Sequence, residues 1–396
     1  RYISPLSEKK SIYCEQTLKV PNYQRLTFVY RKNIQNMKSK LFAFVLACST
    51  ISLIPSATNA CTGITLRSSN QNPILARTIE WGGSDLNSQY VIVPRNYTQQ
   101  SYIPVGTDGM KFTSRYGYAG LAVEQKEFIA EGINEEGLSA GLFYFPRYGQ
   151  YEAYSPELKN SSIADLQLVP YILGCCKTIE DVKKAVKQVH VIAIDPRAST
   201  VHWRFADLSG KQVVLEITNG EAHFFDNELG VLTNSPGFEW QMTNLNNYVS
   251  LLPGSAPVQK LDSIQLTSFG VGSGFYGLPG DITPPSRFVR AAFYQATAPK
   301  LDTEEKTVQQ CFQILNNFDI PIGIEFQKGQ QPTDLPSATQ WTSATDIANR
   351  RIYYRSMHNS AIRCIDLKNI DFSRITYQAT PLDTQKEQPI EYIQIK

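Results

Sequence analysis

A single cysteine, Cys61, offers the most specific chemistry in this sequence because of what precedes it. Met37 opens a stretch with two lysines, an apolar run over Leu41–Ile54 and a small-residue end at Ala60. Basic, apolar and small-residue regions in this order are typical of a secretory signal peptide. Cleavage after Ala60 would leave Cys61 with a thiol and a free α-amine on one residue. An α-amine has an ordinary pKa of about 7.7–8.0, so it can act as base for its own thiol without a histidine.

These features divide the chain into three parts. Residues 37–60 are the predicted signal peptide, and residues 61–396 form the predicted catalytic domain. Residues 1–36 are interpreted as an upstream or mis-called segment, with a basic N-terminal arm as the alternative. The apolar run is too short and too interrupted for a membrane span of about 20 residues, and a lipoprotein anchored through Cys48 would have a very short apolar run before it. The prediction is a secreted or periplasmic protein without a membrane anchor in its mature form.

The charge of the chain argues against nucleic acid as a partner. Residues 1–60 hold nine Lys or Arg and two Glu, a net charge of +7, so the whole-chain value of +2 leaves −5 for residues 61–396. A mildly acidic body lacks the basic surface that phosphate recognition requires. The overall composition is that of a globular protein and excludes collagen, coiled coil and whole-chain disorder.

Other common chemistries find little support. The four histidines (His190, His202, His223, His358) form no HxxxH or HExxH pattern and no pairing with CxxC, so zinc is not expected. Residues 272–277 fit GxGxxG in letters, but Leu-Pro-Gly follows instead of a helix. Five cysteines from Cys61 onward give no regular disulfide framework. A papain-like Cys/His pair would need His202, which lies in a strand-like segment where burial is the simpler interpretation.

The elements that must position Cys61 are read from the apolar pattern. Apolar residues on both sides of the polar segment 68–73 predict a hairpin that returns Arg77–Trp81 beside Cys61. Further strands are expected at 90–95, 200–205, 213–217, 230–233, 322–326, 341–346, 351–355 and 361–366, and residues 128–145 are expected to form a strand, a turn and a second strand. Helices are expected over 163–175, from a capping box at Thr178 onward, over 287–296 and over 303–318. Strands and helices in such blocks predict an α+β fold with antiparallel sheets.

The polar positions around these elements resemble those of the choloylglycine hydrolase family, which includes conjugated bile salt hydrolases and penicillin V acylases. The matching segments occur in the family's order: Cys61-Thr62-Gly63, Arg77 to Trp81, Asn134 to Leu142, Gly230 to Pro236, Asn244 to Tyr248 and Gly277 to Phe288. The resemblance implies an N-terminal-nucleophile hydrolase. Its fold would be a four-layer αββα sandwich, with two antiparallel sheets between helix layers.

The resemblance also implies roles for individual residues. Cys61 matches the nucleophile, Arg77 the arginine against the thiolate, Asn234 the oxyanion donor and Arg287 the second arginine of the site. Glu80 stands where the family usually has the Asp that holds the α-amine. The remaining oxyanion position is Asn in many bile salt hydrolases and Tyr in some penicillin acylases. Here the run before the proline is one residue longer, so Phe143 is the direct match and Tyr144 the alternative.

The predicted function is hydrolysis of a linear amide, with conjugated bile salts as the leading substrate. Penicillin V and N-acyl homoserine lactones are the alternatives within the family, and a non-catalytic ligand-binding protein on the same scaffold is the alternative of another class. The resemblance implies that no metal or organic cofactor is required. It also implies a homotetramer, in which residues 251–274 match the family's assembly loop in position.

Overall fold

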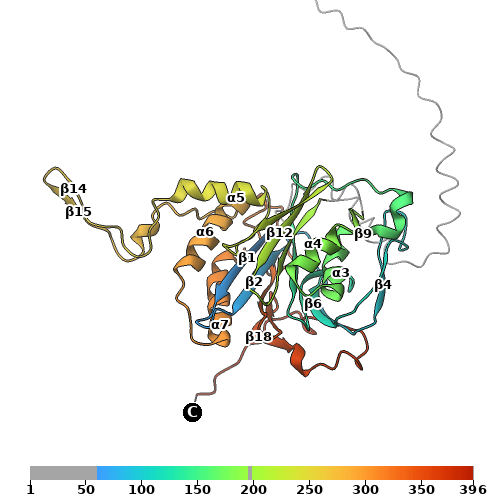
Figure 1. The fold of residues 1–396 in the computed structure, drawn as a ribbon. Coiled ribbons are helices and arrows are strands. Elements are labelled where there is room, and N and C mark those ends of the chain that lie inside the picture. Colours follow the sequence, from blue (N-terminus) through green and yellow to red (C-terminus); the bar gives the residue numbers. More distant parts are fainter. Residues whose placement is uncertain (1–59, 195–198, 396) are drawn as a thin grey trace, which may run out of the picture. The chain divides into compact units, whose positions relative to one another are not determined.

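The computed structural model describes residues 60–194 and 199–395. The predicted upstream segment and the predicted signal peptide lie outside the described residues, except for Ala60. Two antiparallel sheets face each other, and helices cover their outer faces (Figure 1). The predicted four-layer αββα sandwich is confirmed by this arrangement.

The five-stranded sheet carries Cys61 near the start of its first strand. Strand order is β1(Ala60–Arg67), β2(Pro73–Glu80), β16(Thr339–Asp346), β17(Arg351–Ser356) and β18(Asn359–Asp366). The β1–β2 hairpin closes through the predicted polar turn and sets Cys61 opposite Ile79 and Gly63 opposite Arg77. Alternate side chains of a strand point to opposite faces, so the register decides which groups share a face with Cys61.

The eight-stranded sheet packs its inner face against the first. Its order is β13(Glu221–Asp226), β12(Gln212–Thr218), β11(Val201–Ala206), β8(Ser139–Tyr144), β7(Ile129–Asn134), β6(Tyr118–Ala122), β3(Gln89–Val93) and β19(Gln378–Pro381). One continuous cluster of buried apolar side chains joins the two sheets and the helices. Smaller two-stranded pieces are β4(Thr98–Gln100) with β5(Lys111–Thr113), β9(Ser162–Ala164) with β10(His190–Ile192), and β14(Gln259–Leu261) with β15(Ile264–Leu266).

Helices form the two outer layers. α6(Pro284–Thr297) and α7(Glu304–Leu315) pack on the five-stranded sheet, and α3(Leu168–Cys175) packs on the eight-stranded sheet. α4(Ile179–Val186) begins with the predicted capping box, in which Thr178 and Asp181 bond reciprocally. α5(Phe238–Asn244) follows the loop that carries Asn234. α6 begins three residues earlier than expected, because Pro284 and Pro285 occupy its first turn, where proline is tolerated.

Three predicted elements differ from the structure. Residues 163–175 divide into β9, a 3-10 turn over Asp165–Gln167 and α3. Residues 230–233 form an isolated bridge, Leu232 with Gly63, because Gly230 at φ 78° turns the chain. Residues 322–326 form turns around Gly323, which has φ 101°, so apolar composition alone was a poor guide there.

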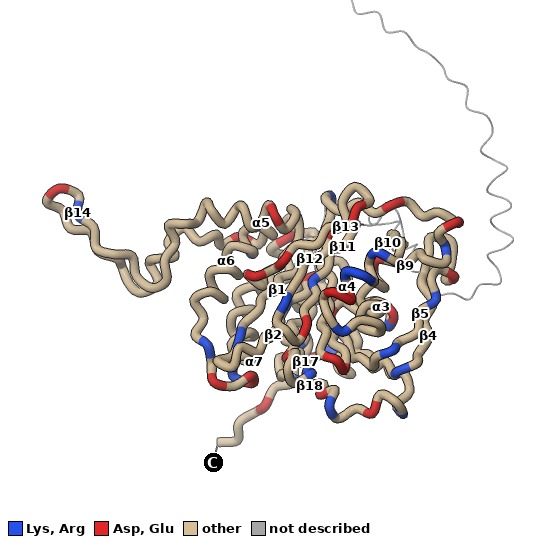
Figure 2. Tube along the Cα trace, viewed as in Figure 1, with Lys and Arg blue, Asp and Glu red and all other residues tan. Residues whose placement is uncertain are grey.

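A long arm (residues 252–274) extends from the sandwich and ends in the β14–β15 hairpin (Figure 1). Backbone hydrogen bonds from Leu252 to Gly274 and from Gly274 to Gly254 close its base. Along the arm almost every residue is exposed, including Val258, Phe269 and Val271. Lys260 and Asp262 are its only ionisable residues, which lie near the tip (Figure 2).

Candidate active site

The sulfur of Cys61 lies inside the sandwich against the guanidinium of Arg77. Arg77 Nη2 is 2.9 Å from Cys61 Sγ, and Cys61 is 4% exposed. Burial raises the pKa of the thiol, and the charge of Glu80 adds to this increase. The charge of Arg77 opposes the increase most strongly, followed by a backbone hydrogen bond from Tyr144 and the charge of Arg287. A cation in contact with the sulfur stabilises the thiolate, which is the nucleophilic form.

Arg77 is held in place by the backbone around it. Its Nε donates to the carbonyl oxygen of Thr78 at 3.2 Å, and its Nη1 donates to the carbonyl oxygens of Ala130 and Leu142. These acceptors come from β2, β7 and β8, so both sheets fix the direction of the guanidinium. Nη2 is thereby left pointing at the sulfur.

Asn234 and Arg287 contact the backbone of Cys61 from the other side. The backbone N–H of Cys61 donates to Asn234 Oδ1 at 2.8 Å, and Arg287 Nη2 donates to the same oxygen at 2.7 Å. Arg287 Nη1 also donates to the carbonyl oxygen of Cys61 and to Thr62 Oγ1. Asn234 Nδ2 donates to the carbonyl oxygen of Tyr144 at 2.7 Å. The predicted polar positions from β1, β2, α6 and the 230–236 loop therefore converge on one residue.

Glu80 lies opposite Ala60 in the β1–β2 register and is almost fully buried. Neither carboxylate oxygen has a hydrogen-bond partner among the described residues. Burial raises the pKa of Glu80 to about 8, against the lowering effects of Arg287, Thr78 and Arg77. A carboxyl at this position is thus close to neutral at pH 7 until a positive charge forms beside it.

Of the two positions considered for the second oxyanion group, the structure brings Tyr144 to the sulfur. Its backbone makes a hydrogen bond with Cys61, and its ring meets Trp81 edge-on at 6.4 Å. The Phe143 side chain instead points into the protein, fully buried, with its ring centre 4.0 Å from Arg77 Cζ. Alternation along β8 explains the difference, because neighbouring residues face opposite sides of the sheet.

His202 is placed as a structural residue. Its Nδ1 lies 3.1 Å from Glu216 Oε1 and its Nε2 lies 3.1 Å from the carbonyl oxygen of Thr233. The ring stacks on Phe145 at 4.4 Å and is fully buried. With both ring nitrogens occupied, His202 cannot serve as the base of a papain-like pair. It holds the residue that precedes Asn234.

The chain is similar in sequence and in fold to proteins of one known family. Residues 61–385 match the model of the linear amide C–N hydrolases, choloylglycine hydrolase family. The chain belongs to the choloylglycine hydrolase family. It is 32% identical over 327 residues to a bile salt hydrolase/transferase of Clostridium perfringens, covering 80% of this chain and 96% of that protein. It is 25% identical over 389 residues to a penicillin V acylase of Pectobacterium atrosepticum, covering 91% of this chain and 94% of that protein.

A solved structure agrees with these matches. The conjugated bile acid hydrolase of Clostridium perfringens superposes with a TM-score of 0.73 at 28% identity, covering 84% of this chain and 100% of that chain. The protein is therefore a hydrolase of linear amide C–N bonds, of the bile salt hydrolase and penicillin V acylase type. The resemblance found in the sequence is confirmed.

Two further observations concern metal ligands and membrane-spanning helices in this choloylglycine hydrolase family member. Within the described ranges no group of three His, Cys, Asp or Glu side chains could hold a metal ion. In the same part of the chain, none of the helices has the length and apolarity that crossing a bilayer demands.

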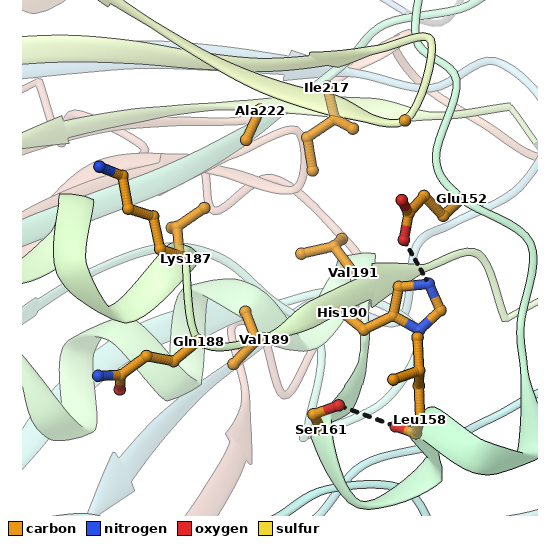
Figure 3. A pocket seen from close by; sticks show the side chains of 12 residues that line it. Glu152, Leu158, Ser161, Lys187, Gln188, Val189, His190, Val191, Ile217 and Ala222 are labelled. Carbon is orange, nitrogen blue, oxygen red and sulfur yellow. Dashed lines mark hydrogen bonds and ion pairs between the residues drawn. The ribbon is translucent and has the colours of Figure 1, made fainter.

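A separate cavity of about 270 Å³ lies at the surface near α4 (Figure 3). Val186, Val191, Ile217 and Ala222 supply apolar walls, and His190 Nε2 lies 3.2 Å from Glu152 Oε2 at one side. None of the residues that surround Cys61 lines this cavity, so the cavity is separate from the candidate active site.

Sequence reasoning missed three buried charged residues near the site. Glu131 and Arg204 lie behind Arg77, and Glu216 lies behind His202. Each occupies a strand position between apolar residues. A charged residue at an inward-facing strand position is the one signal in the sequence that marks them, because such residues are rarely buried without a partner.

Proposed function

We propose that this protein hydrolyses the amide bond of conjugated bile salts, with Cys61 as an N-terminal nucleophile freed by cleavage after Ala60. The observation that carries the proposal is the surroundings of Cys61. Arg77 contacts its sulfur, while Asn234 accepts a hydrogen bond from its backbone nitrogen. Nucleophile and base therefore sit on one residue whose two ends are fixed separately.

The first half of the reaction forms a thioester. The α-amine of Cys61, directly or through a water, accepts the thiol proton, and Arg77 stabilises the thiolate. The sulfur attacks the amide carbon, and the carbonyl oxygen becomes an oxyanion. Asn234 Nδ2 and the backbone N–H of Tyr144 are the donors proposed to hold it. As the C–N bond breaks, the α-ammonium returns its proton to the departing amine.

The second half regenerates the enzyme. Water loses a proton to the α-amine and attacks the thioester carbon at the same oxyanion donors. The C–S bond breaks, the acid leaves, and the thiolate regains the proton. The proposal involves no metal or organic cofactor in either half.

Glu80 is the proposed partner of the α-ammonium in the processed chain. Its oxygens lack hydrogen-bond partners among the described residues while Ala60 is present, and it lies opposite Ala60 in the hairpin. A positive charge created at Cys61 would favour the ionised carboxylate. Glu would thus replace the usual Asp with one more methylene between backbone and charge.

Ala60 explains why processing must precede activity. Its side chain is buried with Ile320 and Ala338. While it remains, the nitrogen of Cys61 is an amide, which has no basic lone pair.

A second candidate is penicillin V acylation, which one observation favours. Tyr144 rather than Asn occupies the strand position next to the sulfur, and Trp81 packs against it. Two aromatic rings in contact with each other near the nucleophile would suit a phenoxyacetyl group as well as a steroid. The higher identity to a bile salt hydrolase supports bile salts as the leading substrate.

Location and assembly are part of the same proposal. The predicted signal peptide, 37–60, would deliver the protein to the periplasm or outside the cell, where cleavage exposes Cys61. The exposed apolar residues of the arm support assembly into a homotetramer.

The test begins with the N-terminus. Secreted protein is expected to start at Cys61 by mass spectrometry and to release glycine or taurine from conjugated bile salts. Phenoxyacetate release from penicillin V is measured beside it, and a variant that cannot be cleaved after Ala60 is the control. Turnover by a chain that retains Ala60 would contradict the mechanism, whereas processed protein that releases product from no amide would favour a ligand-binding role.

A further inference from the structure

A buried charged triad lies behind the arginine that contacts Cys61. Glu131 Oε2 on β7 is 3.7 Å from Arg77 Nη1 and 3.7 Å from Arg204 Nη2 on β11. All three side chains are at most 1% exposed. The steps proposed above use Arg77 alone, so the other two charges are unexplained.

The triad is built around the ring of Phe143. The ring centre lies 4.0 Å from Arg77 Cζ and 5.3 Å from Arg204 Cζ, so both guanidinium groups contact one aromatic side chain. Such cation–π contacts favour the charged guanidinium inside a protein. Phe143 therefore contacts both arginines, and Glu131 is the acid between them. Burial raises the pKa of the Glu131 carboxyl, and the charges of Arg204 and Arg77 oppose this increase.

Two glycines make room for this packing. A Cβ on Gly63 would lie 2.8 Å from Arg204 Nη1 and 2.9 Å from Phe143 Cζ, and a Cβ on Gly141 would lie 2.2 Å from Glu131 Oε2. Gly63 is two residues after Cys61 on β1. The triad thus packs directly against the backbone that carries the nucleophile.

Charge rather than hydrogen bonding couples the triad. Glu131 Oε2 and the Nε and Nη2 atoms of Arg204 have no hydrogen-bond partner in the described ranges. Arg204 Nη1 donates to the carbonyl oxygen of Ile64 at 3.2 Å, and Glu131 Oε1 lies 3.4 Å from Ser139 Oγ. A buried pair with so few hydrogen bonds is a weak source of stability.

We propose that Glu131 and Arg204 are positioning residues that act through Arg77 and set the positive charge felt by the Cys61 sulfur. Arg204 adds positive charge behind Arg77, and Glu131 reduces it. The inference rests on the proposed role of Cys61 as nucleophile. It assigns a function to residues that touch no substrate.

Apart from Arg77, the charged groups near the Cys61 sulfur are not paired with Glu131 or Arg204 in the described ranges. Arg77 on β2 contacts the sulfur, whereas Glu80 on β2 and Arg287 on α6 influence the pKa of the thiol through their charges. Cys311 on α7 is the remaining titratable group near Arg204. Substitution of Glu131 or Arg204 therefore changes one charge behind Arg77 and leaves the groups in contact with Cys61 unaltered.

The experiment measures the rate at which iodoacetamide alkylates Cys61 as a function of pH, in processed protein, with peptide mass spectrometry to separate Cys61 from Cys175 and Cys364. Glu131→Gln removes the negative charge and should lower the pH midpoint. Arg204→Met removes a positive charge and should raise it. Each shift is expected to be about half a pH unit or more, and the double variant should return close to the parent.

Two controls separate charge from structure. Glu131→Asp keeps the charge and should keep a midpoint near that of the parent. Arg363→Met breaks an ion pair with Asp383 elsewhere in the molecule and should leave the midpoint unchanged. Circular dichroism checks folding, and where one single variant does not fold, the other and the double variant decide the outcome.

Shifts of both single variants in the same direction, or defects that add in the double variant, would overturn the inference. Equal midpoints in all folded variants would overturn it as well. Alkylation does not depend on substrate turnover, so failure of the proposed amidase activity is seen separately: parent protein would then show the pH midpoints without product release.

Discussion

The surroundings of Cys61 and the arm differ in which side chains they bury and which they expose. Around Cys61, charged and polar groups are buried, and backbone carbonyls from two sheets fix Arg77 in one direction. Along the arm, apolar side chains such as Phe269 and Val271 are fully exposed and only Lys260 and Asp262 are ionisable. Buried charge is costly and is retained where it acts on a bond, whereas exposed apolar surface is retained where another surface can cover it.

This contrast leads us to expect that substitutions near Cys61 change chemistry and leave assembly alone. Cys61→Ser should show the largest effect, a loss of at least about 10³-fold in turnover, because the hydroxyl is a far weaker nucleophile near neutral pH. The processed protein should elute from a sizing column like the parent. Retention of a tenth of the parent's activity would show that another group attacks the amide.

Asn234→Ala should follow, with a loss of about 10²–10³-fold in kcat and a small change in KM. Its Nδ2 is a proposed oxyanion donor, and such a donor acts mainly in the transition state. Asn247→Ala is the matched control, since Asn247 is exposed and bonds only to its neighbour Asn244 among the contacts recorded. A change in KM with unaltered kcat would assign Asn234 to substrate binding instead.

His202 should affect the reaction rate by positioning the loop that carries Asn234. Its Nε2 contacts the carbonyl oxygen of Thr233, and Glu216 accepts from the backbone N–H of Phe238, so the pair braces both ends of the loop that carries Asn234. His202→Gln should lower kcat by about ten- to a hundredfold, because small displacements of a reacting group are expensive. In a protein that already carries Asn234→Ala, His202→Gln should lower kcat much less. An equal loss of kcat with and without Asn234→Ala would contradict the proposal that His202 positions Asn234.

Much of the fold and most of the polar residues around Cys61 could be predicted from the sequence. The β1–β2 hairpin, which returns Arg77 beside Cys61, and the capping box of α4 follow from local patterns. The convergence of Asn234 and Arg287 on Cys61 was implied by the family resemblance. Phe143 and Tyr144 could not be separated, since the extra residue before Pro146 leaves the strand alternation undefined until β8 pairs with β11.

Contacts between buried residues on different strands could not be predicted from the sequence. The pairing of Glu131 with Arg204 joins residues 73 positions apart, and that of His202 with Glu216 depends on neighbouring strands. Residues 322–326 looked like a strand because they are apolar, but Gly323 turns the chain there. Contacts of this kind depend on tertiary packing, which periodicity does not encode.

Glu80→Gln should have a smaller effect, seen in the stability of protein that retains Ala60. Burial raises the pKa of Glu80 to about 8 from an ordinary value of 4.5, so the native state binds a proton that the unfolded chain releases between these pH values. The stability contributed by this proton is fully present below about pH 4.5 and is lost as pH rises through about 8. The glutamine variant should therefore lose less unfolding free energy between pH 5 and pH 8, by up to a few kcal/mol.

Urea unfolding at the two pH values measures this difference. Asp262→Asn on the arm is the matched control, because it neutralises an acid in an exposed segment. An unchanged pH dependence in Glu80→Gln would mean that Glu80 is already paired before processing. A matching change in Asp262→Asn would mean that net charge, not burial, causes the effect.

Shortening the arm should have the smallest effect on chemistry and the largest on assembly. Replacement of residues 255–273 by a short Gly–Ser link keeps Gly254 and Gly274, whose backbone hydrogen bond closes the base. The arm contributes none of the recorded contacts to Cys61, so the rate of Cys61 alkylation should stay within about twofold of the parent. If the proposed homotetramer forms through the arm, loss of its exposed apolar residues should yield smaller species, measured by light scattering. A shortened protein that remains tetrameric but loses alkylation would reverse the comparison, since the arm would then support the site and some other surface would hold the subunits together.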